Sequence, residues 1–148
     1  MNMTFGSEFA FNGDQTEWLK AVDAIFSTYK DLRIKKNLSA PNTLMMRFSK
    51  GAKAYLAPEY GYTLTAWIGN PVPRQMKHGM EVLEAFQVTC MANGGKSHWG
   101  KMNNRVELNP TLIQAWFPKL HIWKQEMRKF NPNNTFSNAF TDRFGLTQ

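Results

Sequence analysis

The sequence predicts an α+β fold in which an antiparallel sheet has helices packed on one face. Three observations predict it. Short segments alternate between apolar and polar residues, as half-buried strands do, and longer segments carry apolar residues every three or four positions, as amphipathic helices do. These segments follow one another as strand, helix, two strands, helix and further helices, which is an α+β order. At 148 residues the chain is long enough for one domain and short for two, so we expect a single domain over residues 1–148.

The first two elements are a strand and the clearest amphipathic helix of the chain. Residues 3–11 alternate, with Phe5, Phe9 and Phe11 on one face of a half-buried strand. Asp14 and Glu17 have the spacing of a capping box and predict the start of a helix. Its expected buried face consists of the apolar residues Trp18, Val22, Ile25, Tyr29 and Leu32. The sequence Ser39-Ala40-Pro41-Asn42 breaks this pattern.

Two more strands are expected in the middle of the chain. Residues 44–49 alternate, so Met45 and Arg47 should share one face while Leu44, Met46 and Phe48 are buried on the other. After a turn that contains Gly51, residues 63–68 alternate again and predict a third strand. We expect Pro71 and Pro73 to end this strand.

The rest of the chain reads as helices and turns. Residues 74–92 predict a helix that offers Met76, Leu83, Phe86, Val88 and Cys90 to the core, and Asn93-Gly94-Gly95 has the form of a C-cap. Asn109-Pro110 predicts the start of a short helix. A further helix after Pro118 carries Leu120, Trp123, Met127 and Phe130, then a turn over residues 131–134 leads to a short tail. Trp99, Trp116 and Trp123 are expected in the core.

Composition excludes several classes of protein. The single Cys90 rules out an internal disulfide framework, and no basic-then-apolar leader or membrane-length apolar run is present, which favours an intracellular (cytoplasmic or mitochondrial) location over secretion. Three histidines and one cysteine lack zinc-ligand spacing, so no metal site is predicted. The net charge of +7 raises nucleic acid as a partner, but the cations are scattered, and the densest run, residues 30–36, complements the end of a helix dipole. Nucleic acid is therefore the weakest hypothesis.

Three sequence segments resemble one flavoprotein family. The segment GGKSHWGK, residues 94–101, resembles the G-x-P-H-W-[AG]-K signature of the FAD-linked sugar-1,4-lactone oxidases and alditol oxidases, a vanillyl-alcohol-oxidase-type family that includes gulonolactone, galactonolactone and arabinonolactone oxidoreductases. Residues 46–61 resemble the V-R-F-x-x-G-D-D-x-x-L-S-P stretch of that family. Residues 116–140 resemble its closing segment, which ends in F-x-N-x-Y. The similarity covers roughly residues 42–146, in the family's order.

The resemblance implies a fold, a cofactor and a partner. It implies the C-terminal substrate-binding or cap domain of an FAD-dependent oxidoreductase that acts on a sugar-1,4-lactone or a polyol. The family's FAD-binding domain has no counterpart in this sequence, so activity is expected only with a separate FAD-binding chain or domain. The closing segment 131–148 is expected to return to that flavin domain.

The same resemblance implies site residues. The lysine of H-W-x-K and the arginine of the family's E-x-R strand line its pocket, which makes Lys101 and Arg47 the expected catalytic residues. The expected cofactor-binding residues are Lys101, His98 and Asn138, and the expected substrate-binding residues are Met45, Arg47 and Trp67. The motif H-W-G-K is expected to be a strand that holds Lys101 toward flavin and substrate.

Departures from the family keep a second hypothesis open. Met45 stands where the E-x-R motif has its carboxylate, and a thioether cannot orient a sugar diol as a carboxylate does. Arg47 then needs another acceptor, such as a ligand oxygen, a backbone carbonyl or Glu8 on the first strand. The alternative is a non-catalytic structural or interaction subunit that keeps the fold without the active site. Whether Arg47 and Lys101 converge on one cavity separates the two hypotheses.

Overall fold

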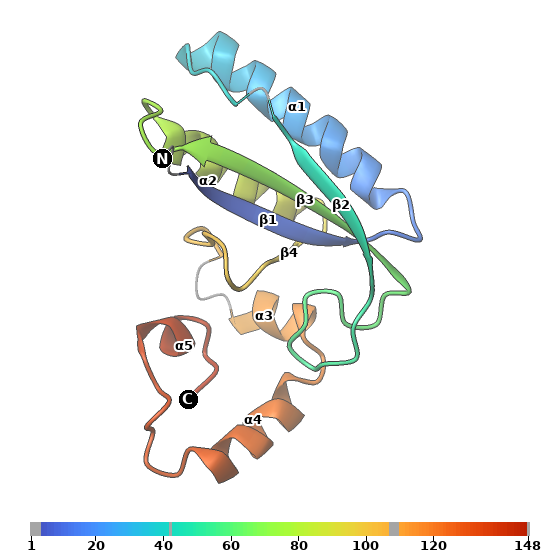
Figure 1. The fold of residues 1–148 in the computed structure, drawn as a ribbon, viewed down its shortest axis with the longest axis vertical. Coiled ribbons are helices and arrows are strands. Elements are labelled where there is room, and N and C mark those ends of the chain that lie inside the picture. The colour runs from blue at the N-terminus through green and yellow to red at the C-terminus, as the bar shows by residue number, and fades with distance from the viewer. Residues whose placement is uncertain (1–3, 42, 107–109, 148) are drawn as a thin grey trace.

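A computed structural model describes residues 4–41, 43–106 and 110–147 (Figure 1). The chain begins with a four-stranded sheet and two long helices, in the order β1 (Thr4–Asn12), α1 (Glu17–Lys36), β2 (Met45–Lys50), β3 (Leu64–Pro73), α2 (Gly79–Ala92) and β4 (Lys96–Ser97). Three shorter helices follow, α3 (Pro110–Trp116), α4 (Leu120–Phe130) and α5 (Ala139–Arg143). In Figure 1 these three helices form a group below the sheet.

The predicted fold class is confirmed. The strands lie in the order β2-β3-β1-β4, and each neighbouring pair is antiparallel. Helices α1 and α2 pack on one face of this sheet (Figure 1). The β-α-β-β-α-β sequence of elements is the split βαβ arrangement of ferredoxin-like domains. The opposite face of the sheet is free of helices α1 and α2 and carries the site described below.

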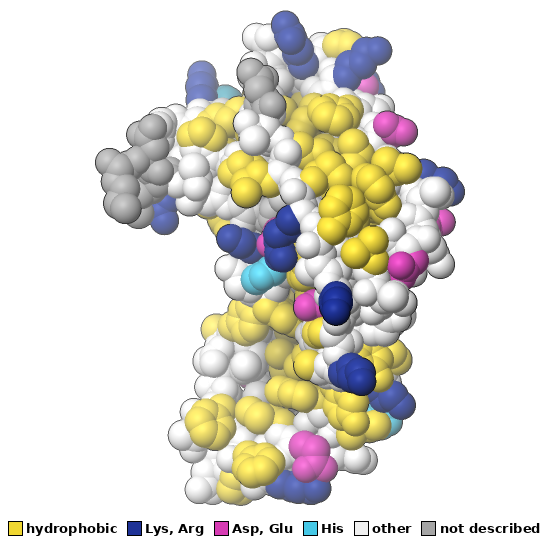
Figure 2. Space-filling view, turned by 45° about the vertical axis from the view of Figure 1, so that its right-hand side comes forward, with side chains coloured by type: hydrophobic (Ala, Val, Ile, Leu, Met, Phe, Trp, Pro, Cys, Tyr) yellow, Lys and Arg dark blue, Asp and Glu magenta, His cyan; other side chains and the backbone are white. Residues whose placement is uncertain are grey.

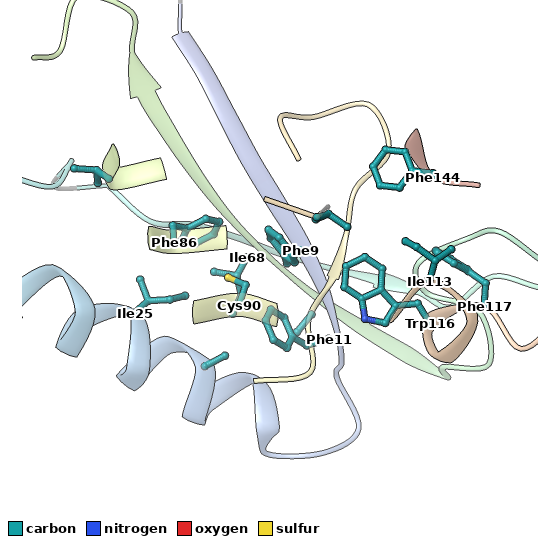
Figure 3. Close-up of a cluster of buried hydrophobic side chains, with 14 of the residues drawn as sticks. Phe9, Phe11, Ile25, Ile68, Phe86, Cys90, Ile113, Trp116, Phe117 and Phe144 are labelled. Atoms are coloured by element: carbon teal, nitrogen blue, oxygen red, sulfur yellow. The ribbon is translucent and has the colours of Figure 1, made fainter. Parts of the chain in front are cut away.

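One hydrophobic core joins the sheet to helices α1, α2, α3 and α4 (Figure 3). Phe9 and Phe11 of β1 are 0% and 1% exposed, and the ring of Phe9 meets that of Phe86 edge-on at 5.9 Å between centroids. Further along, the indole of Trp99 stacks on the ring of Phe117 at 5.1 Å. Trp116 is 6% exposed, so its expected place in the core is confirmed, whereas Trp99 and Trp123 are only partly buried and pack against the core.

Helix α1 has the predicted apolar face but a different beginning. Its buried residues are Ala21, Ile25, Tyr29 and Leu32, with Trp18 and Val22 packed against them. The N-cap is Thr16 without a side-chain cap bond, so the predicted capping box of Asp14 and Glu17 is wrong. The Asp14 carboxylate instead accepts backbone N–H groups of Thr63 and Leu64 at 3.3 and 3.2 Å, which ties the start of α1 to the start of β3. The last turn of α1 contains Arg33, Lys35 and Lys36, so cations lie at the negative end of the helix dipole as predicted.

Strand β3 is longer than predicted, and α2 is correspondingly shorter. Pro71 and Pro73 pair with β1 within the strand, whereas the pairing of β3 with β2 ends at Gly69. Beyond Gly69, β3 is an edge on its β2 side, and an edge tolerates residues without an N–H. Because the strand reaches Pro73, residues 74–78 form turns and α2 begins at Gly79 instead of residue 74.

The core face and the end of α2 can be compared directly with the prediction. Phe86 and Cys90 are fully buried as expected, but Val88 is 46% exposed, because it lies on the opposite side of the helix from them. The predicted C-cap is confirmed. Gly94 has a φ of +81°, and Gly95 N–H reaches the Cys90 carbonyl at 2.9 Å, a Schellman ending.

Two sequence predictions differ from the structure, one on the exposure of β2 and one on the closing tail. Met46 and Phe48 face the helices as predicted but are 42% and 53% exposed, so their predicted burial is wrong. The reason is topological: β2 is an edge strand, and α1 covers it only in part, with Trp18 edge-on to Phe48 at 5.5 Å. The closing tail also contains a helix, α5, that the sequence analysis missed. The predicted cap at Asn109 lies outside the described residues, and α3 does begin at Pro110.

Candidate functional site

The helix-free face of the sheet brings together one charged or aromatic side chain from each of three strands. Trp67 of β3 pairs with Arg47 of β2, and Glu8 of β1 pairs with Gly69, the next β3 residue on the same face. Arg47 Nε donates to Glu8 Oε1 at 2.8 Å and Nη2 donates to Oε2 at 3.3 Å. Glu8 is therefore the acceptor that Arg47 needs in the absence of a carboxylate at position 45. The two-bond geometry fixes the plane of the guanidinium.

Trp67 supports Arg47 from below. The guanidinium carbon lies 4.4 Å from the centre of the Trp67 ring, within the range of a cation–π contact. The indole Nε1 donates to Ser49 Oγ at 2.9 Å, and the residue is only 4% exposed. Trp67 was predicted to bind substrate directly. It lies beneath Arg47 and the ring of His98, 5.4 Å away, and does not line the cavity described below.

The H-W-G-K motif is a tight turn, which corrects the prediction of a strand. Strand β4 ends at Ser97, and Lys101 N–H closes a turn on the His98 carbonyl at 3.2 Å. The chain keeps contact with β1 on both sides of the turn, through His98 N–H to the Glu8 carbonyl at 2.8 Å and Met102 N–H to the Gly6 carbonyl at 3.0 Å. The extra residues between these two anchors must loop outward.

His98 connects the turn to the carboxylate. Its Nδ1 accepts the Gly100 N–H at 3.0 Å, so the neutral ring carries its proton on Nε2. That Nε2 lies 4.0 Å from Glu8 Oε2, with Glu8 only 15% exposed at its side chain. His98 is thus a structural neighbour of both Glu8 and Trp67.

An open cavity of about 500 Å³ lies at this end of the sheet. Its floor includes Gly6, Gly69 and Pro71, and its walls include Met45 and Lys101. The nearest atom to a Cβ built at Gly69 is 3.6 Å away, so the space above this residue is open. An open cavity of this size, lined by both polar and apolar residues, suits a small-molecule ligand.

Of the two predicted catalytic cations, Lys101 lines this cavity and Arg47 does not. Glu8 is part of the lining and binds Arg47, so this carboxylate links Arg47 to the cavity that Lys101 lines. Arg47 is half exposed at its side chain. Among the described residues, Lys101 has no ion-pair partner and is exposed. Convergence of both cations on one cavity therefore stays a prediction: Lys101 lines the cavity, and Arg47 is linked to it only through Glu8.

Asn138 has a structural duty within the closing segment. Its Oδ1 accepts the N–H groups of Phe140 and Thr141 at 2.9 and 3.2 Å, which completes a capping box at the start of α5. Helix α5 then packs on the turn, with the ring of Phe144 5.0 Å from that of Trp99. Asn138 does not line the cavity, and its expected contact with a cofactor stays a prediction, as does the return of residues 131–148 to a flavin domain.

Sequence reasoning missed a buried polar network that anchors the far side of the turn. Gln87 of α2 is fully buried, and its Nε2 donates to Ser7 Oγ and Asn104 Oδ1, both at 2.8 Å. Its Oε1 accepts Arg105 N–H at 2.9 Å. The available signal was the position of Gln87 on the same helix face as Leu83 and Cys90. A buried amide with all its bonds made holds a backbone in one place.

Titration and metal chemistry add little to this site. Burial raises the pKa of the Cys90 thiol, so this residue stays protonated within the core. Burial also lowers the pKa of Lys96, whose ammonium lies 4.7 Å from the Tyr62 ring. In the described ranges no three His, Cys, Asp or Glu side chains gather as a metal site would require. No helix in the same ranges has both the length and the apolar character of a membrane span.

Comparison with protein families now bears on this geometry. The family described as D-arabinono-1,4-lactone oxidase matches residues 5–144, a span that contains Glu8, Arg47 and the H-W-G-K turn. The chain belongs to this family. Its members are oxidoreductases related to sugar-lactone oxidases and are generally FAD-linked, so the predicted family is confirmed. None of the curated proteins matches the chain.

As a D-arabinono-1,4-lactone oxidase family member, the chain has residues that fit one part of FAD. Lys101 in the cavity lining, and Arg47 bound to Glu8 of the same lining, are cations of the kind that stabilise a flavin ring as it gains negative charge on reduction. For the nucleotide part, the sequence has no glycine-rich dinucleotide fingerprint. A cofactor-binding role for these residues stays a prediction.

Proposed function

We propose that the chain is the C-terminal, substrate-side part of an FAD-dependent oxidoreductase that oxidises a sugar-1,4-lactone or a sugar alcohol. It would work with an FAD-binding domain supplied by another chain or segment. The observation that carries the proposal is that Lys101 and Glu8, the residue that binds Arg47, line one cavity on the helix-free face. Family membership supports the reaction class.

Each residue has a distinct task in this proposal. FAD, when bound, would supply the acceptor for the hydride that leaves the substrate carbon. Lys101 and Arg47 are cations near the cavity, and such cations stabilise negative charge that develops during the reaction. Glu8 and Trp67 hold Arg47 in one orientation, which avoids a reorganisation cost at the moment of reaction.

Glu8 also supplies a hydrogen-bond acceptor at the cavity wall. An ionised carboxylate offers about four lone-pair sites, and Arg47 occupies one site on each of the two oxygens of Glu8. The remaining sites can accept sugar hydroxyl groups, a task for which the Met45 thioether is unsuited. We therefore assign substrate orientation to Glu8 in place of position 45.

A second function is favoured by one observation. Met45 is 58% exposed on the cavity side and leaves the E-x-R position without a carboxylate. If Glu8 does not replace that carboxylate, the chain is a structural or interaction subunit that keeps the fold without catalysis. The two functions differ in whether a flavin-loaded complex reduces a dye when given a lactone.

The test is co-expression of the full chain with the flavin-binding domain of a sugar-lactone oxidase. We expect a complex with flavin absorbance that reduces an electron-accepting dye when D-arabinono-1,4-lactone or a sugar alcohol is added. Lys101→Met should keep the flavin absorbance and lower dye reduction by about 100-fold or more. Lys20→Met, an exposed lysine on α1, is the matched control and should change neither. A flavin-loaded complex without dye reduction would support the structural subunit, and failure to form any complex would contradict both.

A further inference from the structure

Strand β2 presents a free sheet edge. One side of β2 pairs with β3 over six residues without a bulge, from Met45 opposite Gly69 to Lys50 opposite Leu64. No strand among the described residues pairs with its other side. Half of the backbone N–H and C=O groups of such a strand point outward without sheet partners, which makes it a template for another strand. No proline or bulge blocks this template.

An apolar surface accompanies the free edge. On the helix side, Met46 and Phe48 of β2 are 42% and 53% exposed, and Phe26 of the neighbouring α1 is 58% exposed. Trp18 and Val22 of α1 are only partly buried beside them. Figure 2 shows a broad hydrophobic patch in the upper half of the molecule, on the side where β2 forms the edge. One more strand on β2 would lay alternate side chains across this patch.

Two unpaired cations lie at one end of the edge. A cavity of about 460 Å³ separates α1 from the segment that leads into β2, and its lining includes Phe26, Leu44, Lys30 and Arg33. No acidic residue lines it, and among the described residues neither cation has an ion pair. If a strand is added antiparallel to β2, the C-terminal end of the added strand lies beside Met45. Lys30 and Arg33 are at the same end of β2, because they line one cavity with Leu44, the residue before Met45. Carboxylates at the C-terminal end of the added strand would therefore meet both cations.

We infer that the β2 edge and the adjoining side of α1 dock an extended segment of a partner protein. The segment joins the sheet antiparallel to β2, carries apolar residues at alternate positions and ends in acidic residues. A second copy of this chain is a poor occupant, because each copy has a net charge of +7 and Arg47 and Lys50 on the same edge. The inference is independent of the proposed function, since it needs only the edge, the patch and the two cations.

Titration of the isotope-labelled full chain with a synthetic peptide tests the inference. The probe is an acetylated peptide of about ten residues that alternates valine with threonine and ends in two glutamates. We expect slower amide hydrogen exchange across β2 on binding. A peptide of the same composition with its glutamates at the N-terminus should bind about tenfold more weakly. This second peptide separates oriented strand addition from general attraction to a basic protein.

Variants of the chain locate the site. Lys30→Glu with Arg33→Glu should weaken the glutamate peptide about tenfold and favour a peptide that ends in two lysines instead. Phe48→Lys should abolish binding, whereas Val88→Lys, at a similarly exposed apolar residue on α2, should leave it unchanged. No protection of β2 at millimolar peptide, equal binding of the two glutamate peptides, or protection of β2 by self-association alone would overturn the inference.

Discussion

Replacement of Met45 by glutamate tests which face of β2 belongs to the cavity. Met45 is 58% exposed, and the residue opposite it is Gly69, which has no side chain to crowd a carboxylate. We expect Met45→Glu to change the free energy of unfolding by no more than about 0.5 kcal/mol, as is usual for a substitution at an open surface site. In the flavin-loaded complex it should raise lactone-dependent dye reduction or sugar affinity, because it adds a second acceptor for hydroxyl groups.

The main electrostatic cost of Met45→Glu can be worked from the sheet. Glu8 and position 45 lie on opposite sides of Gly69, two strand spacings apart, which is about 10 Å. Two like charges at that distance repel by about 0.4 kcal/mol in water. Physiological salt screens this to about 0.1 kcal/mol. Arg47, two residues along on the same face, offsets what remains.

Thermal unfolding followed by circular dichroism provides the measurement, and Met46→Glu is the matched control. Met46 is adjacent in sequence but faces the helices, opposite the fully buried Ile68. A charge there should cost about 1.5 kcal/mol, or about 4 °C in Tm for a chain of this size. If Met45→Glu costs as much as Met46→Glu, Met45 belongs to a packed face and the cavity assignment fails with it.

Three further predictions concern the clamp, the floor and the core. Glu8→Gln should lower the free energy of unfolding by only about 1 kcal/mol, because its partner Arg47 is half exposed. Thermal denaturation should show a smaller loss of stability in about 1 M NaCl, since salt screens the ion pair. A loss that salt leaves unchanged would mean that packing, not charge, holds the pair. Gly69→Ala should be neutral or stabilise the fold by about 0.5 kcal/mol, because its new Cβ meets no atom closer than 3.6 Å. Gly6→Ala should instead cost about 1–3 kcal/mol, because its new Cβ would lie 2.9 Å from a backbone oxygen. Equal effects of the two substitutions in urea unfolding would contradict this prediction. Burial raises the pKa of the Tyr29 hydroxyl, so on raising the pH the unfolded chain loses the hydroxyl proton before the folded chain does. The free energy of unfolding should therefore fall as pH rises above about 10. Tyr29→Phe should lessen that fall, and identical pH profiles of stability for the two proteins would count against the prediction.

Most of the fold could be predicted because its elements are written in local patterns. The alternation of Phe9 and Phe11 and the helical spacing of Ile25 and Leu32 each depend on residues that are neighbours in sequence, and both became core. The exposure of Phe48 could not be predicted in the same way. Its strand has an ordinary buried-face pattern, and only the strand order reveals that β2 is an edge.

The candidate site shows the same division. The face shared by Met45 and Arg47 follows from strand periodicity, and Glu8 was one of three acceptors proposed for Arg47, beside a ligand oxygen and a backbone carbonyl. The H-W-G-K turn could not be predicted, because it depends on where the backbone returns to β1 at Gly6. The Gln87 network depends on contacts between residues far apart in sequence, and a glutamine within a helix gives little sign of burial on its own.

The arrangement of Glu8 and position 45 bears on how a member of this family can lack the carboxylate of E-x-R. Both residues face the same cavity and lie on opposite sides of Gly69 in one row of the sheet. A ring over Gly69 could be reached by a side chain from either side. A carboxylate at position 8 in place of position 45 still binds Arg47, because the guanidinium donates two hydrogen bonds to Glu8. Loss of a carboxylate at position 45 therefore leaves this face with a carboxylate, an oriented arginine and a lysine. Glu8 binds Arg47 in either function. In an enzyme it would also bind the substrate, and in a structural relative it would not.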